Sequence, residues 1–191
     1  MIKIRHADIT EKYKTYEWLC LSDTAQMHMG EPDYPNNPIP SWEEFKEGFE
    51  NFYYQEETRG KGSVMIIQDD GKDIGCLCYA CFHLKPQKAE LDIWLKGKEY
   101  CGNGNGTKAL KALCDYLESS YNIKDYIIRP SIKNYRAVRA YEKVGFKKVQ
   151  ENEKEKTINE FLLPEFLNEY GDGDYGFEDT AVLIKTNLNA L

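Results

Sequence analysis

A glycine-rich loop between a strand-like run and an amphipathic helix constrains the fold more than any other feature of this chain. The segment YCGNGNGTKA, residues 100–109, alternates three glycines with two asparagines directly after the apolar run ELDIWL. A strand, a tight turn and a helix start bring unpaired backbone N–H groups to one point, where the helix dipole favours an anion. Glycine suits the turn because a Cβ would block it or keep phosphate oxygens from the backbone. The loop therefore predicts a site for a phosphorylated cofactor.

The spacing of the glycines excludes two common phosphate sites. A dinucleotide fingerprint requires GxGxxG, but the position that would complete it from Gly102 is Thr107. A nucleoside-triphosphate loop requires GxxxxGK followed by Ser or Thr, whereas Gly106 precedes Thr107 and Lys108 here. The loop is therefore expected to hold a different phosphorylated molecule.

Length and charge limit the domain organisation and the partners. A chain of 191 residues suits one well-buried domain, so we expect a single domain over residues 1–191 with an inserted acidic segment at about 157–179. The formal net charge is −7, and no basic block stands out that could neutralise phosphates. Nucleic acid and an anionic membrane are thus unfavoured as partners, and a cationic small substrate suits the charge better.

The N-terminus and the cysteines indicate the compartment and the metal content. The opening MIKIRHADITEKYK is charged almost at once, and no apolar stretch approaches transmembrane length, so we expect a cytoplasmic protein. The run CLCYAC resembles a metal site only superficially. In a strand Cys76 and Cys78 would face one side and Cys81 the other, so three ligands could not converge. We expect no metal.

Periodicity predicts the order of strands and helices. A helix is expected from Asp8 to about Leu21, a second from a Ser41 cap, a third after the glycine loop and a fourth from Asn134 to Gly145. Strands alternate with helices in the second half and a hairpin precedes them, so we expect an α/β (α+β) fold. Its mixed, mostly antiparallel sheet of about six to seven strands should carry helices on both faces. The expected strands are 1–6, 62–69, 73–84, 90–95, 126–129, 146–150 and 180–186.

Two motifs occur together in the second half of the chain. The first, Gln or Arg, two residues, Gly, any residue, then Gly or Ala, is matched by Gly104 and Gly106, with Cys101 at the Gln/Arg position. The second is N-x-x-A-x-x-x-Y-x-K-x-G-F over residues 134–146, and it is met in full. Residues 62–150 thereby resemble the GNAT superfamily of N-acetyltransferases, and the second motif is most similar to that of aminoglycoside 6'-N-acetyltransferases. The chain departs from those enzymes at Arg129, where they carry aspartate, and in the acidic insert.

The resemblance implies the GNAT fold and acetyl-coenzyme A as the cofactor. Asn134 is expected to cap its helix and also to contact the pantetheine arm, and Tyr141 to protonate the departing thiolate. The cofactor-binding residues that it implies are Ile93, Trp94, Leu95, Gly102, Asn103, Gly104, Asn105, Gly106, Thr107, Asn134, Ala137, Tyr141 and Lys143.

The chemistry of transfer needs a group that takes a proton from the amine. An alkyl amine is protonated near neutral pH and attacks only as the free base. Glu90 and Asp92 share one face of the ELDIWL strand with Trp94, and partial burial would raise their pKa values toward the range of a base. Asp92 lies at the position of the aspartate in the similar enzymes, so we expect it to act as base or substrate anchor. Glu90 remains an alternative base, and simple hydration of both acids remains open.

Two acidic segments are candidates for acceptor binding. The loop that contains Glu31, Asp33 and Tyr34 is predicted to bind the substrate together with Asp92. The insert, with the apolar run FLLPEFL and acids such as Asp174, suits a lid over a polycationic acceptor, a self-complementary contact in a homodimer, or an ordinary solvated excursion.

These observations lead to one hypothesis with two alternatives. The chain is expected to be an enzyme that moves an acetyl group from acetyl-coenzyme A directly to a primary amine of a small aminoglycoside-like or polyamine-like cation, with antibiotic modification as one possible role. Acetylation of a protein N-terminus or of lysine is the first alternative. A coenzyme A-binding module without catalysis is the second.

Overall fold

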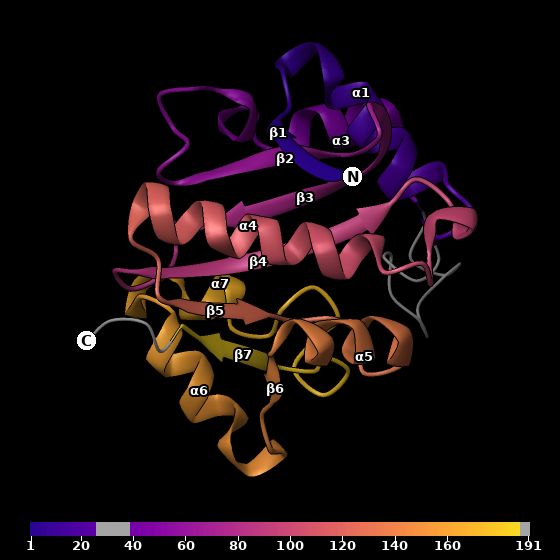
Figure 1. Ribbon diagram of the computed structural model, residues 1–191. Coiled ribbons are helices and arrows are strands. Elements are labelled where there is room, and N and C mark those ends of the chain that lie inside the picture. Colours follow the sequence, from indigo (N-terminus) through magenta and orange to yellow (C-terminus); the bar gives the residue numbers. More distant parts are fainter. Residues whose placement is uncertain (26–38, 188–191) are drawn as a thin grey trace.

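One mixed sheet organises the molecule (Figure 1). The computed structural model describes residues 1–25 and 39–187. In that part of the chain seven strands follow the order β1-β2-β3-β4-β5-β7-β6, and only the β4–β5 pair is parallel. The predicted mixed, mostly antiparallel sheet is therefore confirmed. The strands are β1 Ile2–His6, β2 Gly62–Asp69, β3 Lys72–Ala80, β4 Lys88–Leu95, β5 Asp125–Ile128, β6 Lys147–Lys148 and β7 Leu183–Thr186.

The helices begin and end largely where their capping residues predict. Ser41 forms a capping box with Glu44 at the start of α3, and the Asn134 side chain accepts a hydrogen bond from the backbone N–H of Ala137. Gly145 ends α5 in the left-handed region, at a φ of 103°. The helices are α1 Lys12–Tyr16, α3 Trp42–Gly48, α4 Asn105–Tyr121, α5 Tyr135–Val144, α6 Lys154–Phe161 and α7 Leu167–Tyr170.

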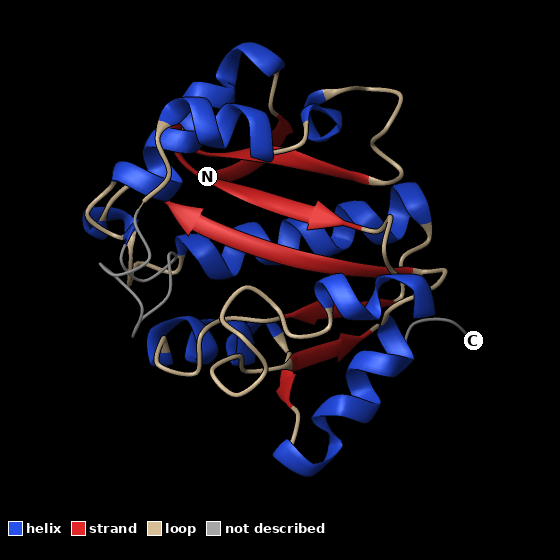
Figure 2. Ribbon diagram, turned by 180° about the vertical axis from the view of Figure 1, so that it is seen from behind, coloured by secondary structure: helices blue, strands red, loops and turns tan. Residues whose placement is uncertain are grey.

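Helices cover both faces of the sheet, as the sequence predicted (Figures 1 and 2). Strand β2 shows why, because its residues alternate between two apolar clusters. Met65 and Ile67 pack in the cluster that contains the apolar stripe of α4. Val64 and Ile66 face the opposite side, where they pack with residues of the N-terminal helical region. The core therefore has two layers separated by the sheet.

Some boundaries differ from the predicted ones for identifiable reasons. Strand β3 ends at Ala80 instead of residue 84, because the backbone N–H groups of Cys81 and Phe82 both bind the carbonyl oxygen of Lys61. The N-terminal helix is divided into a 3-10 turn, α1 and a π-helical turn that ends at Leu21. Strand β6 has two residues where five were expected.

The acidic insert folds onto its own chain. Phe161 and Leu162 are buried together with Leu84 and Ile127, and a β-bridge joins Leu84 to Leu162. These two side chains are therefore unavailable to another molecule, and the hypothesis that they form a self-complementary contact is wrong. A homodimer through another surface stays a prediction.

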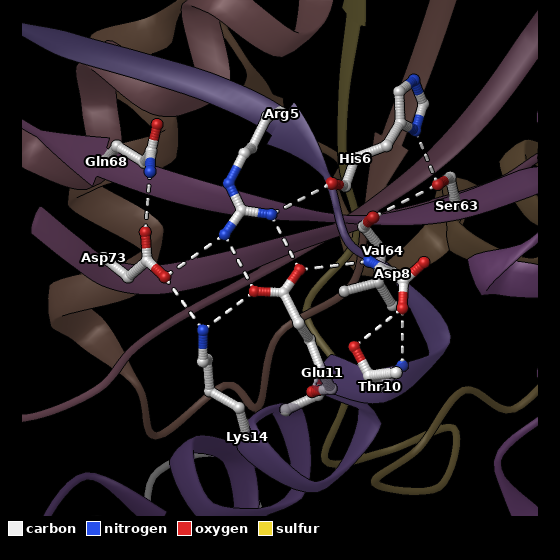
Figure 3. A network of polar contacts seen from close by, with 11 residues as sticks. Arg5, His6, Asp8, Thr10, Glu11, Lys14, Ser63, Val64, Gln68 and Asp73 are labelled. Carbon is white, nitrogen blue, oxygen red and sulfur yellow. Dashed lines mark hydrogen bonds and ion pairs between the residues drawn. The ribbon is translucent and has the colours of Figure 1, made fainter. Parts of the chain in front are cut away.

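A polar network fixes β1 to α1 and to the β2–β3 hairpin (Figure 3). The Arg5 guanidinium donates to both oxygens of Glu11, at 2.7 and 2.8 Å, and Lys14 Nζ lies 2.9 Å from Asp73 Oδ2. Hydrogen bonds from Arg5 lower the pKa of Glu11 to about 2, with Lys14 and the backbone N–H of Asp8 acting in the same direction against burial. This network stabilises the edge of the sheet that lies farthest from β6.

Two further features concern membranes and metals. Across residues 1–25 and 39–187, no helix combines the length and the apolarity needed to cross a bilayer. Nor do His, Cys, Asp and Glu side chains gather there in a group of three that could hold a metal ion. Cys76 is buried and Cys78 half-buried in β3, while Cys81 lies beyond the end of that strand.

Candidate active site

A gap in the sheet lies between β4 and β5. The two strands pair only as far as Leu91 and Ile128, and residues 92–95 pair with β3 alone. Two cavities adjoin this gap, one of about 780 Å³ and one of about 370 Å³. The residues that line both of them are Ile93, Trp94, Asn134 and Tyr141.

The glycine loop lines the larger cavity. Gly102 and Gly104 have φ values of 81° and 78°, a left-handed backbone that residues with a Cβ adopt only at a cost. Gly104 is the N-cap of α4, so the first N–H groups of a 17-residue helix point toward the loop. The side-chain amides of Asn103 and Asn105 donate to the carbonyl oxygens of Glu99 and Tyr100. These asparagines brace the loop and lie outside the lining of the cavity.

Most of the residues predicted to bind the cofactor come together in this cavity, and basic side chains join them. Arg136, Arg139 and Lys143 line it from one stripe of α5, and Lys108 lines it from α4. Lys143 is among the residues that the resemblance implies, whereas Lys108, Arg136 and Arg139 are not, although the spacing of three and four residues on α5 is visible in the sequence. A backbone anion cradle beside four cations fits a molecule with several phosphates. The predicted residues that line the cavity are Ile93, Trp94, Leu95, Gly102, Gly104, Gly106, Thr107, Asn134, Ala137, Tyr141 and Lys143.

The smaller cavity is lined by aromatic side chains and by carboxylates. Phe49 and Tyr53 line it from the N-terminal half, Phe82 from the segment after β3, and Tyr170 and Tyr175 from the insert. Glu90 and Asp92 line it from β4, as their shared strand face predicts. Aromatic faces and carboxylates both attract a cation.

Asp92 has the properties of a base at neutral pH. Surrounding protein removes much of its hydration and raises its pKa to about 7, and the charge of Asp174 acts in the same direction. The backbone N–H of Ile93 donates to Asp92 Oδ1 at 2.7 Å and partly opposes this shift. Asp92 nevertheless keeps an exposed surface toward the smaller cavity, because the protein surrounds the carboxylate without covering it.

Glu90 differs from the expectation. Its burial favours a raised pKa, but the charge of Arg129 and hydrogen bonds from His83 and Arg129 outweigh burial and lower the pKa to about 2. Arg129 Nε lies 2.5 Å from Oε1, and His83 Nε2 lies 2.8 Å from Oε2. Glu90 is therefore ionised and paired, and the expected rise in its pKa is wrong. Its proposed role as a base loses its physical support.

Comparison with known proteins identifies the family. A family model of the acetyltransferase (GNAT) domain matches residues 2–147 of this chain. The chain belongs to the GNAT acetyltransferase family. Enzymes of this family use acetyl-coenzyme A as donor, so the predicted N-acetyltransferase activity and cofactor are confirmed. Among curated proteins, none matches this acetyltransferase.

Solved structures share the fold of this acetyltransferase at low sequence identity. The aminoglycoside acetyltransferase AAC(6')-Ib, in complex with coenzyme A and kanamycin, is 18% identical with a TM-score of 0.66, over 98% of this chain and 95% of that one. RimL, a ribosomal alpha-N-protein acetyltransferase in complex with coenzyme A, is 19% identical with a TM-score of 0.66, over 97% and 93%. A chimera of the Vibrio cholerae spermidine N-acetyltransferase SpeG is 16% identical with a TM-score of 0.66, over 97% and 95%. The predicted GNAT fold is confirmed.

Tyr141 connects the two cavities of this acetyltransferase. It lies on α5, packs against Phe146 and is almost fully buried. Desolvation raises its pKa well above the usual value, and the charge of Asp92 acts in the same direction. The phenol therefore keeps its proton at neutral pH and is able to donate it.

The two segments predicted to bind the acceptor can be compared with the structure only in part. Glu31, Asp33 and Tyr34, the predicted substrate loop, lie outside the described residues. The insert contributes Tyr170, Asp174 and Tyr175 to the lining of the smaller cavity. Only the acidity of the insert pointed to this in the sequence. Its position favours the lid interpretation over a solvated excursion.

Proposed function

We propose that this acetyltransferase moves the acetyl group directly to the primary amine of a small cationic acceptor, within a complex that holds donor and acceptor together. The observation that carries the proposal is that the two cavities share a wall, formed by Ile93, Trp94, Asn134 and Tyr141. Tyr141 lines both, and Asp92 lines the smaller one. A donor in the larger cavity and an amine in the smaller one would meet between an acid and a base.

The larger cavity suits the proposed donor. When bound, acetyl-coenzyme A supplies an activated acetyl group as a thioester. The backbone N–H groups at Gly104 and Gly106 would hold its pyrophosphate at the start of α4. Arg136, Arg139 and Lys143 would bind its phosphates, and the edge of β4 from residue 93 to residue 95 would lie beside its pantetheine arm. The complexes of AAC(6')-Ib and RimL with coenzyme A support this placement.

Asp92 would remove the proton from the acceptor. The ammonium form of the amine is the one that a carboxylate attracts, so the cation binds first and then transfers a proton to Asp92 Oδ1 or Oδ2. A carboxyl pKa of about 7 narrows the gap to an alkyl amine, whose usual pKa is about 10.4. The free amine then carries the lone pair that attacks.

Tyr141 would give its hydroxyl proton to the sulfur as the C–S bond of the thioester breaks, and would regain a proton from the nitrogen that has attacked. The raised pKa keeps the Tyr141 hydroxyl protonated at neutral pH. Because Tyr141 lines both cavities, this hydroxyl would lie near the thioester sulfur, where negative charge develops. The Asn134 side chain fixes the start of α5 through Ala137 and so orients this residue.

The lining favours a compact cation as the acceptor. The carboxylates of Asp92 and Asp174 suit the ammonium group of an aminoglycoside-like or a polyamine-like amine, and the SpeG chimera and AAC(6')-Ib support these classes. A cavity of about 370 Å³ lies at the low end for small-molecule sites and does not favour a peptide, which would need an open groove.

A panel assay tests the proposal. Thiol release from acetyl-coenzyme A is followed with small amines, polyamines, aminoglycosides, and peptides with a free N-terminus or a lysine. We expect turnover with a member of the first three groups. Turnover with peptides alone would favour protein acetylation, and tight cofactor binding without any turnover would favour a non-catalytic module.

A further inference from the structure

Arg129 joins a carboxylate in the lining of the smaller cavity to the insert. Its side chain is only 5% exposed, and it follows the last residue of β5. On one side its Nε and Nη2 donate to the two oxygens of Glu90 at 2.5 and 2.9 Å. On the other side its Nη1 donates to the carbonyl oxygens of Tyr170 and Gly171 at 2.6 and 3.2 Å. One guanidinium thus uses its planar fork to hold strand β4 and the insert together.

The neighbours of this pair strengthen the connection. His83 Nε2 shares the Glu90 carboxylate, and its ring stacks on Tyr170 with centroids 4.9 Å apart. Phe82 meets the rings of Phe166 and Tyr170 edge to face, at 5.8 and 5.6 Å. The insert is therefore fixed by a buried ion pair and a set of aromatic contacts at the rim of the cavity.

The fixed segment places a second carboxylate in the cavity. Asp174 follows Gly171 by three residues and lines the cavity together with Asp92. The charge of Asp174 raises the pKa of Asp92. Of the charged side chains in the described lining, Glu90 and Arg129 neutralise each other, with His83 on the same carboxylate. Neither Asp92 nor Asp174 forms an ion pair within the described lining, although the charge of Arg129 also acts on Asp174. The segment also lies beyond residue 147, where the matched family domain ends.

We propose that Asp174 is an acceptor-binding residue that holds the ammonium beside Asp92, and that Arg129, through its pair with Glu90, is the positioning residue that keeps residues 170–175 over the cavity. The inference deepens the proposed function and rests on it. An ammonium has three N–H donors, so one can bind each carboxylate. Asp92 takes its proton, while Asp174 keeps the amine in place.

The geometry also assigns a substrate class. Two carboxylates on one amine, surrounded by Phe49, Tyr53, Tyr170 and Tyr175, favour an acceptor with one primary ammonium on a compact body. A bulky, highly hydroxylated acceptor is disfavoured by size, because a cavity of about 370 Å³ lies at the low end for small-molecule sites. The acceptor of highest kcat/KM should therefore be a small mono- or diamine.

The test compares four proteins: wild type, Asp174→Asn, Arg129→Lys and the control Asp172→Asn. Asp172 lies on the same segment, is exposed and is absent from the lining of the cavity. We expect Asp174→Asn to raise the KM for the amine by about tenfold to a hundredfold, the range for a lost hydrogen bond to a charged group. The KM for acetyl-coenzyme A should stay unchanged, and Asp172→Asn should match wild type in both constants.

Arg129→Lys tests the positioning role with a second readout. Lysine keeps the positive charge, but its single ammonium cannot bind both Glu90 and the carbonyl groups of the insert as the guanidinium does. Hydrogen–deuterium exchange in the peptide that covers residues 167–176 should therefore accelerate. The KM for the amine should rise with little change in the KM for acetyl-coenzyme A. Exchange in Asp174→Asn should remain that of wild type, because Arg129 still binds the carbonyl groups of Tyr170 and Gly171.

Distinct results would overturn the inference and the proposed function. An unchanged amine KM in Asp174→Asn would refute the binding role, and faster exchange in Arg129→Lys without a change in amine KM would refute the positioning role. Highest kcat/KM for an aminoglycoside would refute the substrate class. A wild-type protein that acetylates no amine at all would instead refute the proposed function itself.

Discussion

The pH dependence of Asp92 gives the most quantitative prediction. With a pKa of about 7, the fraction of this carboxylate that is ionised should fall from about 0.9 at pH 8 to about 0.1 at pH 6. A base works only when ionised, so kcat/KM for the amine should fall about tenfold over this range. This fall forms the acid limb of the pH profile of kcat/KM. The acceptor's own ionisation does not produce the limb, because the cation is the form that binds.

The groups that face Asp92 set the position of the limb. Desolvation by the surrounding protein comes first, and the carboxylates of Asp174 and Glu90 add negative charge, Glu90 being paired with Arg129. Tyr141 faces it from α5 as an un-ionised phenol. The limb should therefore lie well above the usual range of an aspartate, whose pKa is about 3.9.

The assay follows thiol release at saturating acetyl-coenzyme A across pH 5.5–8.5, with the acceptor at a concentration below its KM. Asp92→Asn should lower kcat/KM by about 10²–10⁴ and abolish the limb, since the amide cannot take a proton. The control Asp172→Asn should retain both rate and limb. If the limb near pH 7 persisted in Asp92→Asn, another group would be the base and the reasoning would fail.

Three further predictions concern the acid, the loop and the sheet edge. Tyr141→Phe should lower kcat by at least about tenfold with little change in the KM for acetyl-coenzyme A, measured by steady-state kinetics, because only the proton donor is lost. Gly104→Ala should weaken coenzyme A binding in calorimetry, since a Cβ at a φ of 78° costs about 1–2 kcal/mol, whereas Gly48→Ala meets open space and serves as control. Glu11→Gln should lower the free energy of unfolding in urea at pH 7 by about 1–3 kcal/mol, because Arg5 loses its ionised partner. The pKa of Glu11 is depressed in the folded state, so this stabilisation is present above about pH 4.5 and is lost as the pH falls toward 2.

Each of these has a result that would contradict it. A Tyr141→Phe variant with wild-type kcat would remove the phenol from the mechanism. Equal coenzyme A affinity in Gly104→Ala and Gly48→Ala would mean that the left-handed turn is not needed for the cradle. If wild type and Glu11→Gln lost stability in parallel between pH 4.5 and 2, the pair with Arg5 would not be the source of the acid sensitivity.

The parts of the site that the sequence predicted well are encoded locally. The ELDIWL strand, the glycine turn and the start of α4 follow one another within 16 residues, and the conformations of Gly102 and Gly104 follow from having no Cβ. The Asn134 cap and the Gly145 stop are local in the same way. Such features need no knowledge of distant contacts.

The parts that the sequence could not predict depend on contacts between distant residues. Glu90 and Arg129 are 39 positions apart, and without that contact the burial of Glu90 suggests a raised pKa instead of a lowered one. The fate of Phe161 and Leu162 depends on Leu84 in the same way, since an apolar run without its partner resembles a surface for another molecule. In the sequence Arg129 is only a departure from the family pattern, whereas the structure shows that it binds two carbonyl groups of the insert.

Direct acetyl transfer at the shared wall of the two cavities is the central claim. The measurement that tests it most directly is mass spectrometry of an amine mixture incubated with acetyl-coenzyme A and either wild type or Asp92→Asn. We predict that at least one small primary amine gains one acetyl group with wild type and that this product is nearly lost with Asp92→Asn. Acetylated product formed equally by both proteins, or thiol release without any acetylated amine, would contradict the account.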